Sequence, residues 1–228
     1  MSIREVKGNI FSTEAQTIVN TVNCVGVMGA GIALECRLRY PKMFQKYAEF
    51  CEQGLLKPGK LWLYKDQSPW VLNFPTKDHW RYPSKELYLR VGLINFVETY
   101  KKRGITSVAF PLLGADKGGI DKDVSKSIMK EYLSGLDIDI EIYEYDPNAT
   151  DPLYLEIQEW ILSANLTNLS EKTGISLKYL ILINDSMMRK EIHQVGQILS
   201  IKGIGTHSVE KLLDYKFNQP QNLQISLF

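Results

Sequence analysis

The 228 residues are 44% hydrophobic and 23% charged, with 27 lysines and arginines against 26 aspartates and glutamates. The hydrophobic fraction is enough to bury a core, and it excludes a disordered chain or a collagen-like repeat. The near-neutral charge excludes a uniformly basic surface, so any contact with nucleic acid must be local.

Cysteine usage and the N-terminal segment bear on the compartment. The three cysteines lack C-x-x-C spacing, which is typical of a reducing compartment and argues against a zinc site or a disulfide framework. Arg4, Glu5 and Lys7 interrupt the N-terminal segment, and no apolar run approaches about 18 residues. The sequence therefore predicts a soluble cytoplasmic protein that does not bind a membrane.

Short β-rich runs alternate with amphipathic helical windows up to about residue 146, which predicts an α/β domain. The predicted strands are residues 3–6, 17–22, 60–64, 70–74, 107–111 and 138–145. The clearest helix spans residues 84–102, because Leu87, Val91 and Ile94 recur at helical spacing. Ser84 is its predicted N-cap, and Gly104 is predicted to end it.

The character of the sequence changes after residue 145. Two prolines and several turn-forming residues between positions 146 and 152 predict a linker. From residue 153 onward the pattern predicts helices only, and a stretch rich in Gln and Asn begins at residue 217. We therefore predict a domain over residues 1–147, a small all-α domain over residues 153–216 and a flexible tail over residues 217–228.

Two loops carry glycines where a predicted strand gives way to a helix. The first glycine loop, residues 27–33, holds Gly29 and Gly31, and the second glycine loop, residues 112–120, holds Gly114, Gly118 and Gly119. Each loop alone is either a tight turn or a place where backbone amides approach an anion. Neither matches a Walker A motif or the full G-x-G-x-x-G spacing. Together they suggest a diphosphate held by backbone amides, with no metal or other cofactor required.

Several motifs resemble the macrodomains, a family of ADP-ribose-binding folds. They are Asn-Thr-Val-Asn at residues 20–23, Gly-Ala-Gly-Ile at residues 29–32 and Gly-Gly-Ile at residues 118–120. Residues 23–29 and 73–81 are similar to macrodomains of the DarG type, which are DNA ADP-ribosyl glycohydrolases and antitoxins of the toxin DarT. The resemblance covers residues 1–146. It implies a mixed sheet between helices and release of ADP-ribose from a nucleobase in DNA.

Lys77 is the candidate catalytic residue. It follows an apolar strand, so its amine is either partly desolvated beside a concave wall or an ordinary solvated charge. The resemblance implies the first interpretation, because the lysine of this motif is catalytic in DarG-like macrodomains. An amine with a lowered pKa can attack the anomeric carbon of the distal ribose.

The resemblance also implies a set of ADP-ribose contacts. Asn23 matches the asparagine that contacts the distal ribose, whereas Asn20 is interpreted as an internal strut. Asn9 stands where many macrodomains carry the aspartate that reads adenine, and Tyr145 either stacks on adenine or is an ordinary strand-end aromatic. The full predicted set is Asn9, Ile10, Asn23, Met28, Gly29, Ala30, Gly31, Ile32, Thr76, Gly114, Lys117, Gly118, Gly119, Ile120 and Tyr145.

The neighbours of the lysine leave two questions open. Related hydrolases place a supporting aspartate where this sequence has Gly118. Asp116 is interpreted as a loop acid and Asp121 as a helix N-cap, so the sequence does not say whether a carboxylate assists Lys77. His79 and Trp80 either line the place of the modified base or pack their loop against the domain.

Two segments of the predicted helical domain are similar to DNA-binding motifs. Residues 169–180 have the pattern of a helix-turn-helix. Residues 199–213 are similar to a helix-hairpin-helix, in which Gly203 and Gly205 would expose backbone amides to a DNA phosphate. The alternative for both is a plain helical turn.

Three further expectations concern partners and function. The last five residues, Gln224 to Phe228, resemble the bacterial sliding-clamp-binding pentapeptide, or are an incidental apolar end. A DarT-like toxin is a possible partner, although in the family a longer C-terminal part contacts the toxin and this sequence departs from that pattern. The alternative functions are hydrolysis of ADP-ribose esters on protein Asp or Glu side chains, and ADP-ribose binding without catalysis.

Overall fold

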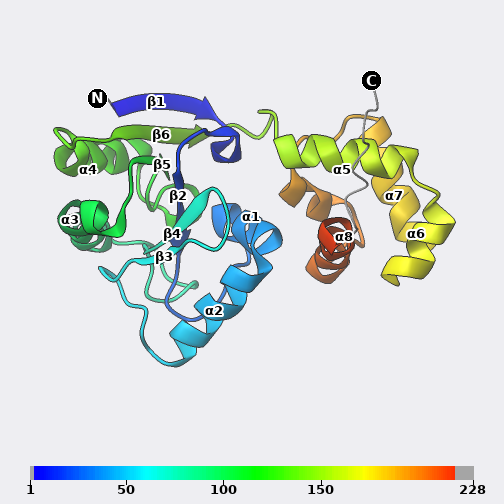
Figure 1. Cartoon of the computed structure of the whole chain (residues 1–228), viewed down its shortest axis with the longest axis horizontal. Coiled ribbons are helices and arrows are strands. Elements are labelled where there is room, and N and C mark those ends of the chain that lie inside the picture. The colour runs from blue at the N-terminus through cyan, green and yellow to red at the C-terminus, as the bar shows by residue number, and fades with distance from the viewer. Residues whose placement is uncertain (1–2, 219–228) are drawn as a thin grey trace, which may run out of the picture. The chain divides into compact units, whose positions relative to one another are not determined.

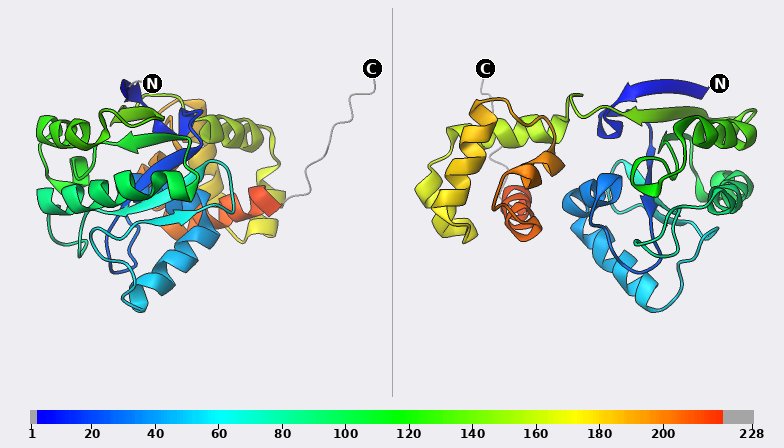
Figure 2. Two further views of the ribbon diagram at one scale, coloured as in Figure 1. Left: turned by 60° about the vertical axis from the view of Figure 1, so that its left-hand side comes forward. Right: turned by 180° about the vertical axis from the view of Figure 1, so that it is seen from behind.

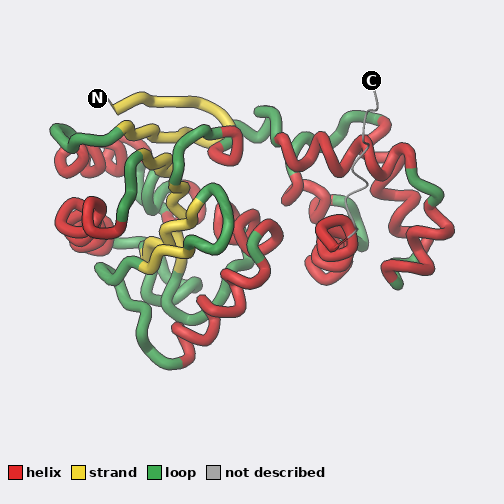
Figure 3. Tube along the Cα trace, in the orientation of Figure 1, coloured by secondary structure: helices red, strands yellow, loops and turns green. Residues whose placement is uncertain are grey.

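The computed structural model describes residues 3–218 (Figures 1 and 2). The chain divides into two compact units, one ending at Asp151 and the other beginning at Pro152. The first unit holds all six strands that the structure describes, whereas residues 152–218 contain only helices and turns (Figure 3). No described helix is both long enough and apolar enough to cross a membrane.

The strands are β1 (Ile3–Gly8), β2 (Thr17–Val22), β3 (Trp62–Tyr64), β4 (Trp70–Pro75), β5 (Ser107–Pro111) and β6 (Asp139–Tyr145). The α-helices of the first unit are α1 (Gly31–Arg39), α2 (Pro41–Glu52), α3 (Glu86–Arg103) and α4 (Lys122–Leu133). The second unit has α5 (Pro152–Ser163), α6 (Leu166–Thr173), α7 (Leu177–Met188) and α8 (Thr206–Asn218). Short 3₁₀ helices are η1 (Ile10–Ser12), η2 (Asp116–Gly118) and η3 (Val195–Ser200).

The six strands form one sheet in the order β1-β6-β5-β2-β4-β3. All neighbouring pairs are parallel except β3 and β4, which are antiparallel. Helices α3 and α4 cover one face of the sheet and α1 and α2 cover the other (Figure 1). The predicted α/β architecture, a mixed sheet between helices, is confirmed.

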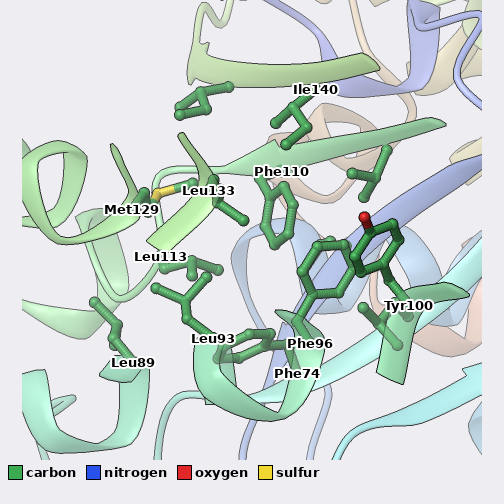
Figure 4. Packing of buried hydrophobic residues seen from close by; sticks show 14 of the residues in the cluster. Phe74, Leu89, Leu93, Phe96, Tyr100, Phe110, Leu113, Met129, Leu133 and Ile140 are labelled. Atoms are coloured by element: carbon green, nitrogen blue, oxygen red, sulfur yellow. The ribbon is translucent and has the colours of Figure 1, made fainter. Parts of the chain in front are cut away.

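Alternating residues of the strands feed two apolar layers, as the period of two in a strand requires. On β2, Val19 points into the layer under α3 and α4, and Ile18 into the layer under α1 and α2. The first layer is rich in aromatic rings (Figure 4). There the rings of Phe96 and Phe110 meet edge to face, with centroids 5.2 Å apart.

The topology directs the candidate ligand loops to one edge of the sheet. Since β1, β2, β4, β5 and β6 are parallel, the loops that follow them all leave from the same edge. Adjacent strands β2 and β5 lead to helices on opposite faces, α1 and α4 respectively. Such a switch point opens a crevice at the carboxyl ends of the strands, which is where open α/β sheets bind ligands.

Most element predictions agree with the structure, and two need correction. The predicted bounds of β2 and β5 are confirmed. The predicted strand at 60–64 begins only at Trp62, because Lys60 closes a turn by donating to the backbone oxygen of Lys57. Ser84 is not the N-cap of α3. The helix starts at Glu86, and the Ser84 backbone instead donates to the Gly118 oxygen, at 2.9 Å.

The predicted linker is held against the first unit. The carboxylate of Asp151 is fully buried and lies 2.5 Å from the guanidinium of Arg39, which also pairs with Glu35. Ser12 donates its hydroxyl to the backbone oxygen of Thr150. A buried ion pair of this kind is expensive to break, because the remaining charge stays desolvated. The last residues of the first unit are therefore part of its fold.

The predicted end of the helical domain also needs correction. Helix α8 continues through Phe217 to Asn218, two residues that we predicted to belong to the tail. The Asn218 amide donates to the Asp214 carboxylate one turn earlier, at 2.8 Å, which extends the helix. The rest of the predicted tail, residues 219–228, lies outside the described residues.

The contact between α3 and the sheet gives a stability prediction. A Cβ atom on Gly92 would lie 2.2 Å from the ring of the fully buried Phe74. We expect Gly92→Ala to destabilise the first unit by about 1–3 kcal/mol, because this ring cannot move without disturbing the core. The measurement is urea unfolding. The control is Gly29→Ala, whose added atom meets its nearest neighbour at 3.7 Å. Equal stability of the two variants would contradict the prediction.

Candidate functional site

The two glycine loops meet at the switch point between β2 and β5. A Cβ atom placed on Gly31, the first residue of α1, would lie 3.8 Å from Cγ of Lys117 in the second glycine loop. Gly29, Ala30, Gly31, Lys117 and Gly119 are all exposed there. The structure therefore brings together the two segments that the sequence marks for a diphosphate.

The start of α1 is suited to an anion. Its N-cap is Ala30, which has no side chain able to accept a hydrogen bond from the first turn, and that turn contains no acidic residue. Uncapped N–H groups and the positive end of the helix dipole attract phosphate groups. By contrast, α4 is capped by Asp121, which accepts hydrogen bonds from the backbone of Asp123 and Val124. The capping role predicted for Asp121 is confirmed.

The turn between β2 and the first glycine loop is fixed by Asn23. Its side-chain oxygen accepts hydrogen bonds from the backbone of Val25 and Val27, at 3.0 and 3.3 Å, and its amide donates to the Val27 oxygen. The Tyr47 hydroxyl lies 2.8 Å from the Asn23 backbone oxygen and 3.0 Å from its side-chain oxygen. Burial raises the pKa of Tyr47, which therefore stays protonated as a donor.

The sequence analysis did not identify Tyr47, because it occupies an apolar position of the amphipathic helix α2 and carries no motif. Asn20 has the structural role that the sequence predicts. Its fully buried amide donates to the Asn73 side-chain oxygen at 2.9 Å, linking β2 to β4. Met28, within the first glycine loop, is fully buried, so the structure does not expose it to a ligand. The ribose contact predicted for Asn23 stays a prediction.

Gly118 is required by close packing in the second glycine loop. A Cβ atom there would lie 2.6 Å from the hydroxyl oxygen of Ser84 and 3.2 Å from its Cβ atom, so a larger residue would require the Ser84 side chain to move. Both Gly114 and Gly118 are buried, whereas Gly119 is exposed and has a positive φ of 81°. The close packing against Ser84 favours a small residue at position 118.

Lys77 lies beside the second glycine loop. Its Nζ donates to the backbone oxygen of Lys117 at 2.5 Å. The backbones of Thr76 and Lys77 both donate to the Val22 oxygen at the end of β2. Cys24 donates its backbone N–H to the Asp78 oxygen at 3.1 Å. The lysine is thus held by contacts with both β2 and the second glycine loop.

The environment of Lys77 also changes its acidity. The side chain is partly buried, and desolvation lowers the pKa of its amine below the ordinary lysine value. Burial has this effect because it disfavours the charged form. A larger fraction of the amine is therefore neutral and nucleophilic at a given pH than in an exposed lysine.

The predicted adenine corner lies where β1 and β6 end. Asn9 is 5% exposed, and its side-chain oxygen accepts a hydrogen bond from the Phe11 backbone at 3.0 Å, which caps η1. Ile10 is buried beside it. Tyr145, the last residue of β6, is 52% exposed. The adenine contacts of Asn9 and Tyr145 stay predictions.

An exposed aromatic cluster follows the lysine. The rings of His79 and Trp80 stack with centroids 5.7 Å apart, and the ring of Tyr82 lies 5.5 Å from that of His79. The Arg81 guanidinium lies over the Trp80 ring, 4.9 Å from its centroid. The sequence analysis selected His79 and Trp80 but missed Arg81 and Tyr82. The available signal was the concentration of three aromatic rings within four residues.

The glycine turns of the second unit are partly as predicted. Gly203 and Gly205 are exposed before α8, and Gly203 has a φ of 91°. The first helix of the predicted helix-hairpin-helix is not an α-helix. It is the short 3₁₀ helix η3, which is fixed by a capping box between Gln194 and Gln197. Residues 169–180 form the end of α6, a turn at Gly174 and the start of α7. DNA binding by either segment stays a prediction.

Comparison with known proteins agrees with this geometry. The Macro domain family model matches residues 19–129. A DNA ADP-ribosyl glycohydrolase of Mycobacterium tuberculosis is 41% identical over 141 residues, which are 60% of this chain and 40% of that protein. The chain thus spans less than half the length of this curated relative.

Solved structures give the same result. The macrodomain of Mycobacterium tuberculosis DarG superposes with a TM-score of 0.60 and 39% identity, over 62% of this chain and 97% of that one. Thermosipho africanus DarTG in complex with ADP-ribose superposes with a TM-score of 0.59 and 33% identity, over 66% of this chain and 44% of that one. Residues 3–151 have the topology and loop arrangement described above. The chain therefore belongs to the macrodomain family, and its macrodomain is similar to those of DarG proteins.

Proposed function

We propose that this protein is an ADP-ribosyl glycohydrolase that removes ADP-ribose from a nucleobase in DNA and so reverses a DarT-like toxin. The observation that carries the proposal is the placement of Lys77, whose partly desolvated amine donates to the Lys117 carbonyl in the second glycine loop, where that loop meets the start of α1. The name of the Mycobacterium tuberculosis relative supports the same substrate.

The ADP-ribose would lie along the carboxyl edge of the sheet. The diphosphate would meet the uncapped N–H groups of α1 and the exposed backbone of Gly119. Adenine would lie at the Asn9 corner, with Tyr145 against its face. The distal ribose would then lie beside Asn23 and Lys77, which both belong to segments that follow adjacent strands, β2 and β4.

The proposed reaction has two steps at the anomeric carbon of the distal ribose. The neutral Lys77 amine supplies an electron pair that forms a bond to this carbon, and the bond from the carbon to the nucleobase breaks. The base leaves with the bonding electrons and takes up a proton. Water then displaces the lysine nitrogen and releases free ADP-ribose. The stacked rings of His79 and Trp80 are proposed to contact the base during the first step.

The central prediction concerns Lys77. We expect Lys77→Ala to lower ADP-ribose release on the order of 10³-fold or more, because the reacting nucleophile is lost. Lys77→Arg keeps the positive charge, but its guanidinium stays protonated in proteins and cannot act as a neutral nucleophile, so we expect the same loss. The assay measures release from a thymine-modified oligonucleotide, a guanine-modified oligonucleotide and a glutamate-modified protein.

The exposed Lys85 provides the control, since Lys85→Ala removes a similar charge from the same segment. Release from one oligonucleotide that depends on Lys77 would identify the base. Release from the modified protein alone would assign hydrolysis of ADP-ribose esters on Asp or Glu. ADP-ribose binding without release from any substrate would leave a binding module and contradict the role of Lys77.

The lowered pKa of Lys77 predicts a pH dependence. Only the neutral amine is nucleophilic, so kcat should rise with pH and level off above the pKa of this lysine. Because desolvation lowers that pKa, the rise should lie below the range of an ordinary lysine. Single-turnover release measured between about pH 6 and pH 10 tests this. A rate that falls steadily over this range would exclude a neutral lysine nucleophile.

The second unit is proposed to bind the DNA that carries the modification. Its exposed turn at Gly203 and Gly205 precedes α8 and presents backbone to solvent, as phosphate contacts require. A DarT-like toxin is a further proposed partner. It is supported by a Thermosipho africanus relative, which is named a DNA ADP-ribosyl transferase-DNA ADP-ribosyl glycohydrolase fusion protein.

We also propose that the segment from Gln224 to Phe228, which lies outside the described residues, binds a bacterial sliding clamp. In a surface-binding assay, a chain that ends at residue 223 should show no detectable binding to the clamp, whereas the full chain should bind. ADP-ribose release by this shortened chain serves as the control for folding. Unchanged clamp affinity would remove this partner.

A further inference from the structure

The aromatic cluster defined by His79, Trp80, Arg81 and Tyr82 contains more binding surface than a single base requires. Trp80 is 46% exposed and Tyr82 is 65% exposed, although both are large aromatic residues. The Tyr82 ring lies 5.5 Å from the His79 ring, at an interplanar angle of 53°. Tyr82 is thus accessible to a ligand in addition to the stacked pair of His79 and Trp80.

The segment that carries the cluster is fixed at both ends to the second glycine loop. At its start, Lys77 donates from Nζ to the Lys117 oxygen, and at its end the Ser84 backbone donates to the Gly118 oxygen. Two further hydrogen bonds close it internally, from the backbones of Arg81 and Tyr82 to the Nδ1 atom and the backbone oxygen of His79. The rings are therefore preorganised beside the proposed reaction centre.

The charge of the cluster favours a nucleic acid over an apolar partner. Among residues 3–218, the described interactions of Arg81 are its backbone hydrogen bond to His79 and its contact with the Trp80 ring, and no carboxylate pairs with it. Its guanidinium is therefore available to a phosphate group. Exposed rings together with an arginine form the arrangement that binds single-stranded nucleic acid, in which unpaired bases stack on aromatic faces.

We propose that Tyr82 and Arg81 form a second nucleotide-binding position, which holds the nucleotide next to the modified one in single-stranded DNA. Tyr82 stacks on the neighbouring base, and Arg81 contacts the phosphate between the two nucleotides. This inference rests on the proposed function for its substrate. The second nucleotide-binding position would make the protein act better on a modified base within an unpaired strand than on the same modified base in a nucleoside.

The test compares two substrates with the full chain: an ADP-ribosylated single-stranded oligonucleotide and the ADP-ribosylated nucleoside of the same base. For Tyr82→Ala we expect KM for the oligonucleotide to rise about 5- to 100-fold with kcat unchanged, because stacking on the neighbour is equal in the ground state and the transition state. The advantage of the oligonucleotide over the nucleoside in kcat/KM should fall by the same factor.

Two variants control for other causes. Tyr82→Phe retains the ring and should keep the affinity of the wild type for the oligonucleotide. Leu87→Ala removes a side chain of similar exposure, 62%, from the start of α3 and should change neither parameter. For Arg81→Gln, the slope of log KM for the oligonucleotide against log salt should flatten by about 0.7, the value of one phosphate contact in a single strand.

A second readout is the Kd of an unmodified single strand, measured without any reaction. It should rise about 5- to 100-fold in Tyr82→Ala, in line with the loss of one stacked base. The inference is overturned if this Kd is unchanged or if KM for both substrates rises equally. If the wild type releases ADP-ribose from no DNA substrate while single-strand binding still depends on Tyr82, the proposed function fails and the second nucleotide position stands.

Discussion

The parallel arrangement of five strands is the constraint on which the candidate site depends. Because β1, β2, β4, β5 and β6 run in one direction, every loop that follows them leaves from one edge of the sheet. The neighbouring strands β2 and β5 then lead to helices on opposite faces of the sheet. Neither helix separates the two glycine loops, which therefore lie next to each other. The loops that follow these five strands therefore lie along the same edge of the sheet, although they come from distant parts of the chain.

Backbone hydrogen bonds and buried polar side chains hold that edge in place. Asn23 and the Tyr47 hydroxyl fix the entry to the first glycine loop, and the Ser84 backbone ties the segment after β4 to the second. The Lys77 amine adds a second link between the segment after β4 and the second glycine loop, because it donates to the Lys117 oxygen. A lysine held this way is oriented by its backbone and partly desolvated by its neighbours, and both conditions favour a nucleophile over a surface charge.

The same edge explains why different classes of residue lie close together without forming one motif. The exposed glycines are proposed to meet an anion, and the exposed aromatic residues between positions 79 and 82 are proposed to stack on bases. The chain as a whole is nearly neutral, so it has no uniformly positive surface that would attract nucleic acid. Arg81 places a local positive charge beside the aromatic rings. An ADP-ribosylated nucleotide combines a diphosphate with a base, so it matches both surfaces.

The sequence by itself determined the α/β class, the bounds of β2 and β5, the glycine loops and the resemblance that selects Lys77. These follow from local periodicity and from motifs whose residues are close in the chain. The tertiary structure decided the rest. Ser84 packs on Gly118 and does not cap α3, Tyr47 orients Asn23, and Asp151 is buried against Arg39. Each of these contacts joins segments that are distant in the sequence, and a local pattern contains no information about such a partner.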